Sequence, residues 1–228
     1  PTFWKAVRAT VFFVVLTVPT LVVLGLAIAL GVNRDVKGKR FLRTVFFSPY
    51  VLTVSVVALV WAELYAPDYG PINYYLEFLV SNPPSWLNSF TFAMPAVALA
   101  TIWWTVGFNF VILLAARQGV PERLYEAARI DGASTWRAFK DITLPQMRSA
   151  IMFVTTVQFI ASFQIFGQVY IMTNGGPGNS TQTLVMYLFR MAFREQEFGY
   201  GAAIGYFLFF VLVAVSLVNY KFIGNDNQ

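Results

Sequence analysis

EAARIDGASTWRAFKDITLP, residues 126–145, lies between two long apolar runs and is the most informative stretch of the chain. We expect a helix to begin at Pro121, because proline is favoured at the first helical position. Gly132 can end this helix in the left-handed conformation, because it has no side chain to clash. Ser134 can then cap a second helix. The stretch therefore predicts two short helices joined at a glycine.

Each of these two helices has an apolar face. The apolar positions recur at three- and four-residue spacing, and they are Leu124, Ala127 and Ala128 in the first helix and Trp136, Phe139 and Ile142 or Thr143 in the second. Pro145 should prevent the second helix from continuing smoothly into the next apolar run, because its ring removes a backbone donor. We call residues 121–145 the elbow, and the wider loop that contains it spans residues 117–148.

The spacing within the elbow, EAA-x2-DGAS-x4-F-x2-I-x-LP, resembles the signature cytoplasmic loop of permease subunits in binding-protein-dependent ABC importers. It is most similar to the carbohydrate-uptake branch, the maltose- and glycerol-phosphate-type permeases. Ser149 departs from the pattern, because many relatives have a proline there. Two further segments, NRDVKGKRFLRTVFFSPYVL and MTNGGPGNSTQTLVMYLFRMAF, resemble other parts of these permeases, so the resemblance covers about residues 3–222.

The resemblance implies that the elbow docks in a groove of a cytoplasmic ATPase subunit and carries nucleotide-driven motion into the membrane, which couples two distant sites. Glu126 would be an electrostatic anchor, either to the ATPase or to its own loop. The implied coupling residues are Glu126, Ala127, Ala128, Asp131, Gly132, Ala133, Leu144 and Pro145. The alternative interpretation is a solvated amphipathic loop that lies on the lipid headgroups.

The composition indicates a membrane protein. Of the 228 residues, 57% are hydrophobic and only 12% are charged, about half the charged fraction of a soluble domain. The chain contains no cysteine and no histidine, which excludes disulfides, thiol catalysis and Cys/His metal sites. The sequence pI is near 9.5, but the basic residues flank apolar runs, so we do not expect nucleic acid to be a partner.

The apolar runs predict an all-α, polytopic membrane protein with one transmembrane domain over residues 1–228. The five expected spans are residues 9–33, 44–62, 92–116, 149–172 and 199–220, each near the ~20 residues that cross a bilayer. Related permeases carry one more helix before this point, so we expect a sixth, N-terminal span to precede Pro1.

The positive charges predict the orientation. Because consecutive spans alternate sides, the loop at residues 34–43, the elbow loop and Lys221 share one side of the membrane. Twelve of the sixteen Lys and Arg residues lie on that side, five and six in the two loops plus Lys221. The positive-inside rule therefore puts the elbow in the cytoplasm, at the inner face of a bacterial or archaeal cytoplasmic membrane.

The fourth expected span is unusually polar. On a helical wheel Thr155, Gln158, Ser162, Gln164 and Gln168 fall on one half, opposite Phe159, Phe163 and Phe166. Amides are costly in lipid when they lack hydrogen-bond partners, so this polar face should point at protein or at a wet cavity. We interpret it as part of a solute pathway, whose candidate residues are Trp103, Trp104, Asn109, Gln158, Ser162, Gln164 and Gln168. The alternative is hydrogen bonding between helices.

Other functions are less well supported by the residues. Glu126 and Asp131 are about 140° apart on a helical wheel, so they do not form a catalytic carboxylate pair. An intramembrane serine protease needs a base that no span supplies. A secondary carrier usually has an ionisable residue at the midplane, and the five spans lack one. The glycine-rich run at residues 174–178 lacks the ending of a phosphate-binding loop and predicts a tight external turn. Gly201 and Gly205 form a GxxxG motif that permits close helix packing, and the sequence leaves open whether the packed helix belongs to this chain or to a partner.

The sequence therefore predicts a transport subunit and not an enzyme. By resemblance it would be one of two homologous permeases, surrounded by membrane lipid and paired with an ATPase dimer and an external solute-binding protein. ATP and magnesium would be bound by the ATPase, and no cofactor is expected on this chain. The solute would be a sugar or polyol, because amides, hydroxyls and aromatic rings suit neutral polyols, and the sequence does not distinguish among them.

Overall fold

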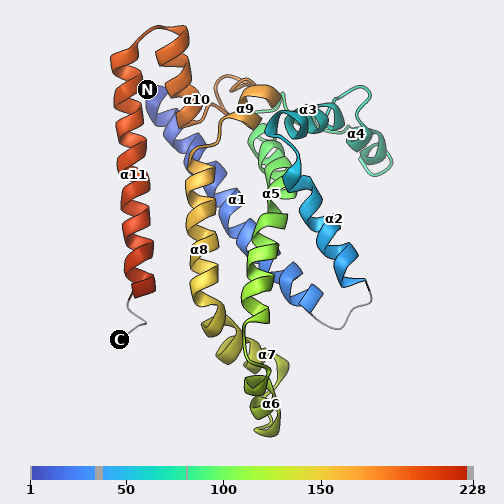
Figure 1. The fold of residues 1–228 in the computed structure, drawn as a ribbon. Helices are drawn as coiled ribbons and strands as arrows, with labels where there is room; N and C mark the ends of the chain where they lie inside the picture. The colour runs from blue at the N-terminus through green and yellow to red at the C-terminus, as the bar shows by residue number, and fades with distance from the viewer. Residues whose placement is uncertain (1, 34–37, 81, 225–228) are drawn as a thin grey trace.

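The fold is a bundle of helices with shorter helices at both ends (Figure 1). A computed structural model describes residues 2–33, 38–80 and 82–224, and the described residues form helices, turns and loops without a strand. The predicted all-α class is therefore confirmed. Residues 34–37, which belong to the predicted first basic loop, lie outside the described residues.

Three long helices are apolar enough to cross a membrane within the described part of the chain, or four if one bent pair is counted as a span. They are α1 (Thr2–Asn33), α5 (Ala93–Gln118) and α11 (Phe198–Gly224). Helix α1 begins seven residues earlier than expected. It packs along α5, and a Cβ added at Gly25 would lie 2.9 Å from Asn109 Cβ, so glycine permits the close crossing.

The second expected span is a bent pair and not one continuous helix. Helices α2 (Lys39–Val51) and α3 (Val54–Leu64) meet at 97°, with Leu52 and Thr53 extended between them. Pro49 has no amide hydrogen to donate to the carbonyl four residues earlier. The Ser48 hydroxyl donates to that Val45 carbonyl oxygen at 3.2 Å instead. The helix ends at Val51, two residues after the proline, whereas the apolar run had predicted one continuous span.

The fourth expected span is also interrupted. Helix α8 (Leu144–Phe163) begins five residues earlier than expected and stops at Gln164, and α9 (Gly167–Met172) follows after residues 164–166. Phe166 has φ −140° and ψ −60°, outside the helical region. In Figure 1, α9 and α3 lie together at the end of the bundle opposite the elbow.

The end of the bundle opposite the elbow is closed by short helices. These are α4 (Pro71–Leu76), α10 (Leu184–Phe189) and the π-helical segment η2 (Arg190–Arg194), which leads into α11. The Trp86 indole donates to Asn73 Oδ1 at 2.7 Å and fixes α4. A Cβ added at Gly201 would lie 2.8 Å from Ala192 Cβ, so the neighbour of this glycine is η2 of the same chain.

Candidate functional site: the elbow and the polar bundle interior

The first helix of the elbow, α6, spans Glu122–Ile130. It begins one residue later than expected, and Pro121 is its N-cap. Gly132 has φ +73°, in the left-handed region. The Gly132 amide donates to the Arg129 carbonyl oxygen at 3.1 Å, and the Ala133 amide donates to the Ala128 carbonyl oxygen at 2.8 Å. These two bonds form a Schellman motif, which ends the helix and turns the chain.

The second helix of the elbow runs directly into α8. Helix α7 (Thr135–Ala138) is capped by Ser134, whose hydroxyl oxygen accepts from the Arg137 amide at 3.3 Å. The π-helical segment η1 (Phe139–Thr143) then joins α7 to α8 without a break. The expectation that Pro145 separates these helices is corrected accordingly. The missing donor of a proline is tolerated in the first turn of a helix, and only the wider η1 turn marks the junction.

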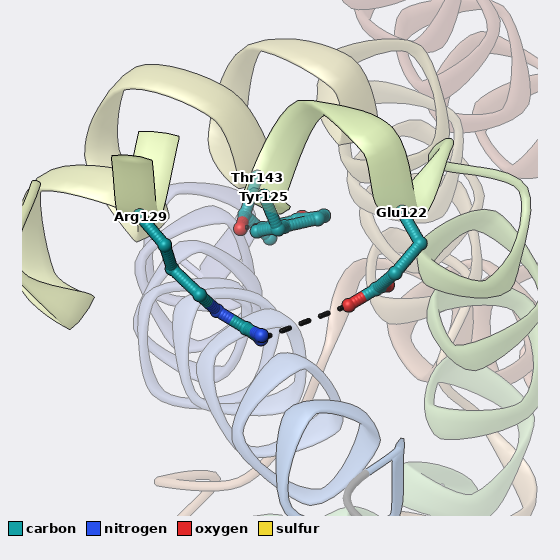
Figure 2. Close-up of polar contacts among 4 residues, drawn as sticks. All are labelled: Glu122, Tyr125, Arg129 and Thr143. Atoms are coloured by element: carbon teal, nitrogen blue, oxygen red, sulfur yellow. Dashed lines mark hydrogen bonds and ion pairs between the residues drawn. The ribbon is translucent and has the colours of Figure 1, made fainter. Parts of the chain in front are cut away.

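Tyr125 attaches α6 to the bundle. Its hydroxyl group is 2.9 Å from Thr143 Oγ1, and this hydrogen bond is buried. The Arg117 guanidinium, at the end of α5, lies 4.2 Å from the centroid of the Tyr125 ring. Figure 2 shows Tyr125 and Thr143 side by side under the helix, with the exposed Arg129–Glu122 ion pair of 3.9 Å in front. The buried contacts hold the elbow, because exposed ion pairs contribute little.

The tip of the elbow exposes large apolar side chains. Ile130 is 87% exposed, and Trp136, on the predicted apolar face of the second helix, is 70% exposed. Trp136 contacts only one neighbouring ring among the described aromatic pairs, that of Phe139, at 5.4 Å. A groove of about 700 Å³ lies between the elbow and the ends of α1 and α5, and Trp136 and Tyr125 line it.

The predicted coupling residues lie together on this outer surface. Glu126, Ala127, Asp131, Gly132 and Pro145 are exposed. Ala128, Ala133 and Leu144 are partly buried, and Ala128 and Ala133 border the groove. The surface offers an apolar tip among small residues, which suits contact with another macromolecule.

The predicted polar residues of the bundle interior divide into two groups. In the first, Asn109, Gln158 and Ser162 are buried and form hydrogen bonds between helices. Gln158 Nε2 donates to Asn109 Oδ1 at 2.8 Å, and Ser162 Oγ lies 3.0 Å from Thr17 Oγ1. These contacts correspond to the alternative interpretation, hydrogen bonding between helices.

The second group lies at the two helix breaks. The Trp104 indole donates to the Leu52 carbonyl oxygen at 3.1 Å, at the bend between α2 and α3, and Trp103 packs edge-on against Trp61. Gln164 is exposed in the break after α8, whereas Gln168 is buried on α9. The break changes the helical register, so these two glutamines do not continue the polar face of α8.

Comparison with known proteins identifies the family. A model described as "binding-protein-dependent transport system inner membrane component" matches residues 3–223. The chain belongs to this family. The predicted permease subunit, its inner-membrane location and its assignment as a transport subunit instead of an enzyme are thereby confirmed.

The permease is similar to sugar-uptake permeases. It is 40% identical to the diacetylchitobiose uptake system permease protein NgcF of Streptomyces coelicolor, over 95% of this chain and 64% of that protein. It is 33% identical to the trehalose/maltose transport system permease protein MalF of Thermococcus litoralis, over 96% of this chain and 74% of that protein. The chain thus spans between 64% and 74% of the length of these two relatives.

A solved structure shares the fold of the permease. A chain from a bacterial alginate ABC transporter, crystallised in complex with an alginate pentasaccharide-bound periplasmic protein, superimposes with a TM-score of 0.90. The match covers 100% of this chain and 80% of that chain at 20% identity, so it bears on the fold alone. Among the residues that the structure describes, no group of three or more acidic side chains is arranged to hold a metal ion.

The helix breaks are features of the permease that the sequence analysis did not predict. The carbonyl oxygens freed at the breaks accept from side chains, at Leu52 from Trp104 and at Ile165 from the Thr183 hydroxyl at 3.0 Å. Such partners are needed because a free carbonyl in lipid is costly. Pro49 was a signal for the first break, whereas residues 164–166 contain neither proline nor glycine.

Proposed function

We propose that this permease is one of two homologous membrane subunits of an ATP-driven importer for a sugar or polyol-type solute. The elbow, residues 121–145, would couple it to an ATPase dimer that binds ATP and magnesium. An external solute-binding protein would deliver the solute. The names of the two relatives, which refer to diacetylchitobiose and to trehalose and maltose, support a carbohydrate.

The observation that carries the proposal is an exposed apolar tip on a firmly attached elbow. Exposure of the Ile130 and Trp136 side chains to water is unfavourable, and burial of both in a partner protein would be stabilising. The Tyr125 contacts with Thr143 and Arg117 tie α6 to η1, which continues into α8, and to α5. A force applied to the tip would therefore reach two helices of the bundle instead of bending the loop.

The two helix breaks support a solute route through the bundle. Interrupted helices line solute sites in many transporters, because backbone groups are free there to meet a polar ligand. The breaks are near each other, since a Cβ added at Gly167 would lie 3.0 Å from Val54 Cγ2. Asn109 Nδ2 is buried without an acceptor among the described residues, so it could donate to a solute hydroxyl. Asn109, Gln158, Ser162, Gln164, Gln168, Trp103 and Trp104 remain our proposed solute pathway.

The test compares Gly132→Val with Gly132→Asn in the assembled transporter, reconstituted in vesicles. A Cβ at Gly132 meets nothing within 4 Å, so the cost of either change comes only from the positive φ. Valine costs about 1–2 kcal/mol or more in the left-handed conformation, whereas asparagine tolerates it. We expect Gly132→Val to insert normally and hydrolyse ATP while solute uptake falls, and Gly132→Asn to retain uptake.

Unchanged uptake in Gly132→Val would contradict the coupling role of the elbow. Membrane insertion, measured by the yield of detergent-extracted permease, separates loss of coupling from loss of the protein.

A further inference from the structure

A polar pocket of about 310 Å³ lies at the external end of the bundle, apart from the elbow and from the bundle interior. It is formed between α9, the turn that follows α9, and the α10–η2 segment. Its size is at the lower end of the range for small-molecule sites. The residues that its chemistry depends on are Tyr170, Asn174, Gln182, Arg190, Arg194 and Glu195.

Gln182, which lines the pocket, has a buried amide oxygen that lacks a hydrogen-bond donor. This residue is only 2% exposed, and its Oε1 atom accepts no hydrogen bond from any residue that the structure describes. A buried amide oxygen without a donor costs about 1–3 kcal/mol. A ligand hydroxyl in the pocket would supply the missing donor.

The two arginines and the single glutamate that line the pocket already have partners within it. Arg190 Nε lies 3.5 Å from Glu195 Oε1, and an Arg194 guanidinium nitrogen donates to the Tyr170 hydroxyl oxygen at 3.3 Å. The pocket therefore offers both donors and acceptors, and Glu195 disfavours an incoming carboxylate. This combination suits a neutral molecule with several hydroxyl groups better than an acidic side chain of a partner protein.

The pocket also has an apolar wall. Phe189 and Met186 line it, and the Tyr170 ring lies 5.8 Å from the Phe189 ring. Aromatic faces beside amides and hydroxyls are suited to a ring that is apolar on its faces and polar at its edge, which describes a sugar. Asn174, in the turn that follows α9, also lines the pocket and has a left-handed backbone with φ +47°.

We propose that this pocket is an external subsite that binds one sugar unit of the solute before translocation. The inference depends on the proposed function only in taking the solute to be a carbohydrate. It adds a binding site on the outer face of this subunit, separate from the proposed pathway between the helices.

The absence of cysteine from the chain allows a direct test of occupancy. Asn174→Cys and Asn179→Cys each introduce one thiol into the same external turn, and both positions have a left-handed backbone, φ +47° and +66°. Only Asn174 lines the pocket, so Asn179→Cys is the matched control. The measurement is the rate of labelling by a membrane-impermeant maleimide in vesicles without ATP, with maltose or diacetylchitobiose as the probe.

At a sugar concentration of three times Kd, we expect labelling of Asn174→Cys to slow about fourfold, as mass action requires. Labelling of Asn179→Cys should not change. Adding Gln182→Met or the exposed change Arg194→Gln should remove the protection, and the second variant guards against a folding defect in the first.

Three outcomes would overturn the inference. The first is that no tested sugar protects either cysteine in vesicles that take up that sugar. The second is that both cysteines are protected equally. The third is that the solute-binding protein protects Asn174→Cys in the absence of sugar. The first outcome leaves the proposed function intact, because uptake is measured in the same vesicles. Failure of uptake for every sugar, with Asn174→Cys still protected, would refute the proposed function and not the subsite.

Discussion

Ile130 gives the sharpest prediction about docking of the elbow. Its side chain is 87% exposed, so nearly all of it is available for burial in an ATPase subunit. Ile130→Ala removes three carbons, and each buried carbon is worth about 0.8 kcal/mol. The change should weaken binding of the ATPase by about 2 kcal/mol, or roughly thirtyfold in Kd. Because Ile130 contributes little to the interior, the stability of the permease itself should not change.

The assay is an equilibrium titration of the detergent-solubilised permease pair with its ATPase, together with thermal unfolding of the permease alone. Leu79→Ala is the matched control, since Leu79 is 82% exposed, loses the same number of carbons and lies in the loop after α4, opposite the elbow. We expect an unchanged Kd for this variant. Equal affinities for both variants and the unchanged protein would refute the docking of this tip.

Two further changes test the packing of the bundle by thermal unfolding in detergent. Gly107→Ala should destabilise the permease by about 1–3 kcal/mol, because its Cβ would overlap the Phe46 carbonyl oxygen. Gly31→Ala is the control, since its Cβ meets nothing within 4 Å and should not change the stability. Equal melting temperatures for the two variants would argue against this close approach of α2 and α5. Gln158→Met should lower the free energy of unfolding by about 1 kcal/mol, because it leaves Asn109 without its hydrogen-bond donor. Adding Asn109→Leu should recover part of that loss. No recovery would mean that the two amides are not coupled.

The elbow was predictable because its determinants are local. Gly132 has the positive φ that its missing side chain permits, and Ser134 caps the next helix through a bond only three residues long. Such interactions depend on a few neighbouring residues, so the residue pattern is enough to predict them. The smaller error at Pro145 has the same origin, because the rule against proline applies to helix interiors and this proline lies in a first turn.

The bundle interior was less predictable because its determinants are distant in sequence. The polar wheel of the fourth span assumed one continuous helix, and the break at residues 164–166 invalidated it for Gln164 and Gln168. That break is stabilised by Thr183, whose hydroxyl donates to the Ile165 carbonyl oxygen from a segment eighteen residues later. Likewise, Gln158 donates to Asn109 across 49 residues, and no local pattern indicates that these two amides meet.

The same contacts connect the external pocket to the helix break. Thr183 follows Gln182 directly, so the residue with the unsatisfied oxygen in the pocket is adjacent to the residue that stabilises the break. The Leu184 amide also donates to Thr10 Oγ1 at 2.9 Å, which ties this segment to α1. A sugar that draws Gln182 toward the pocket would therefore act on the Thr183 bond to Ile165, while the elbow, in its proposed role, would act on the other end of α8. Helix α8 is thus the element through which an external solute and an internal ATPase would influence each other.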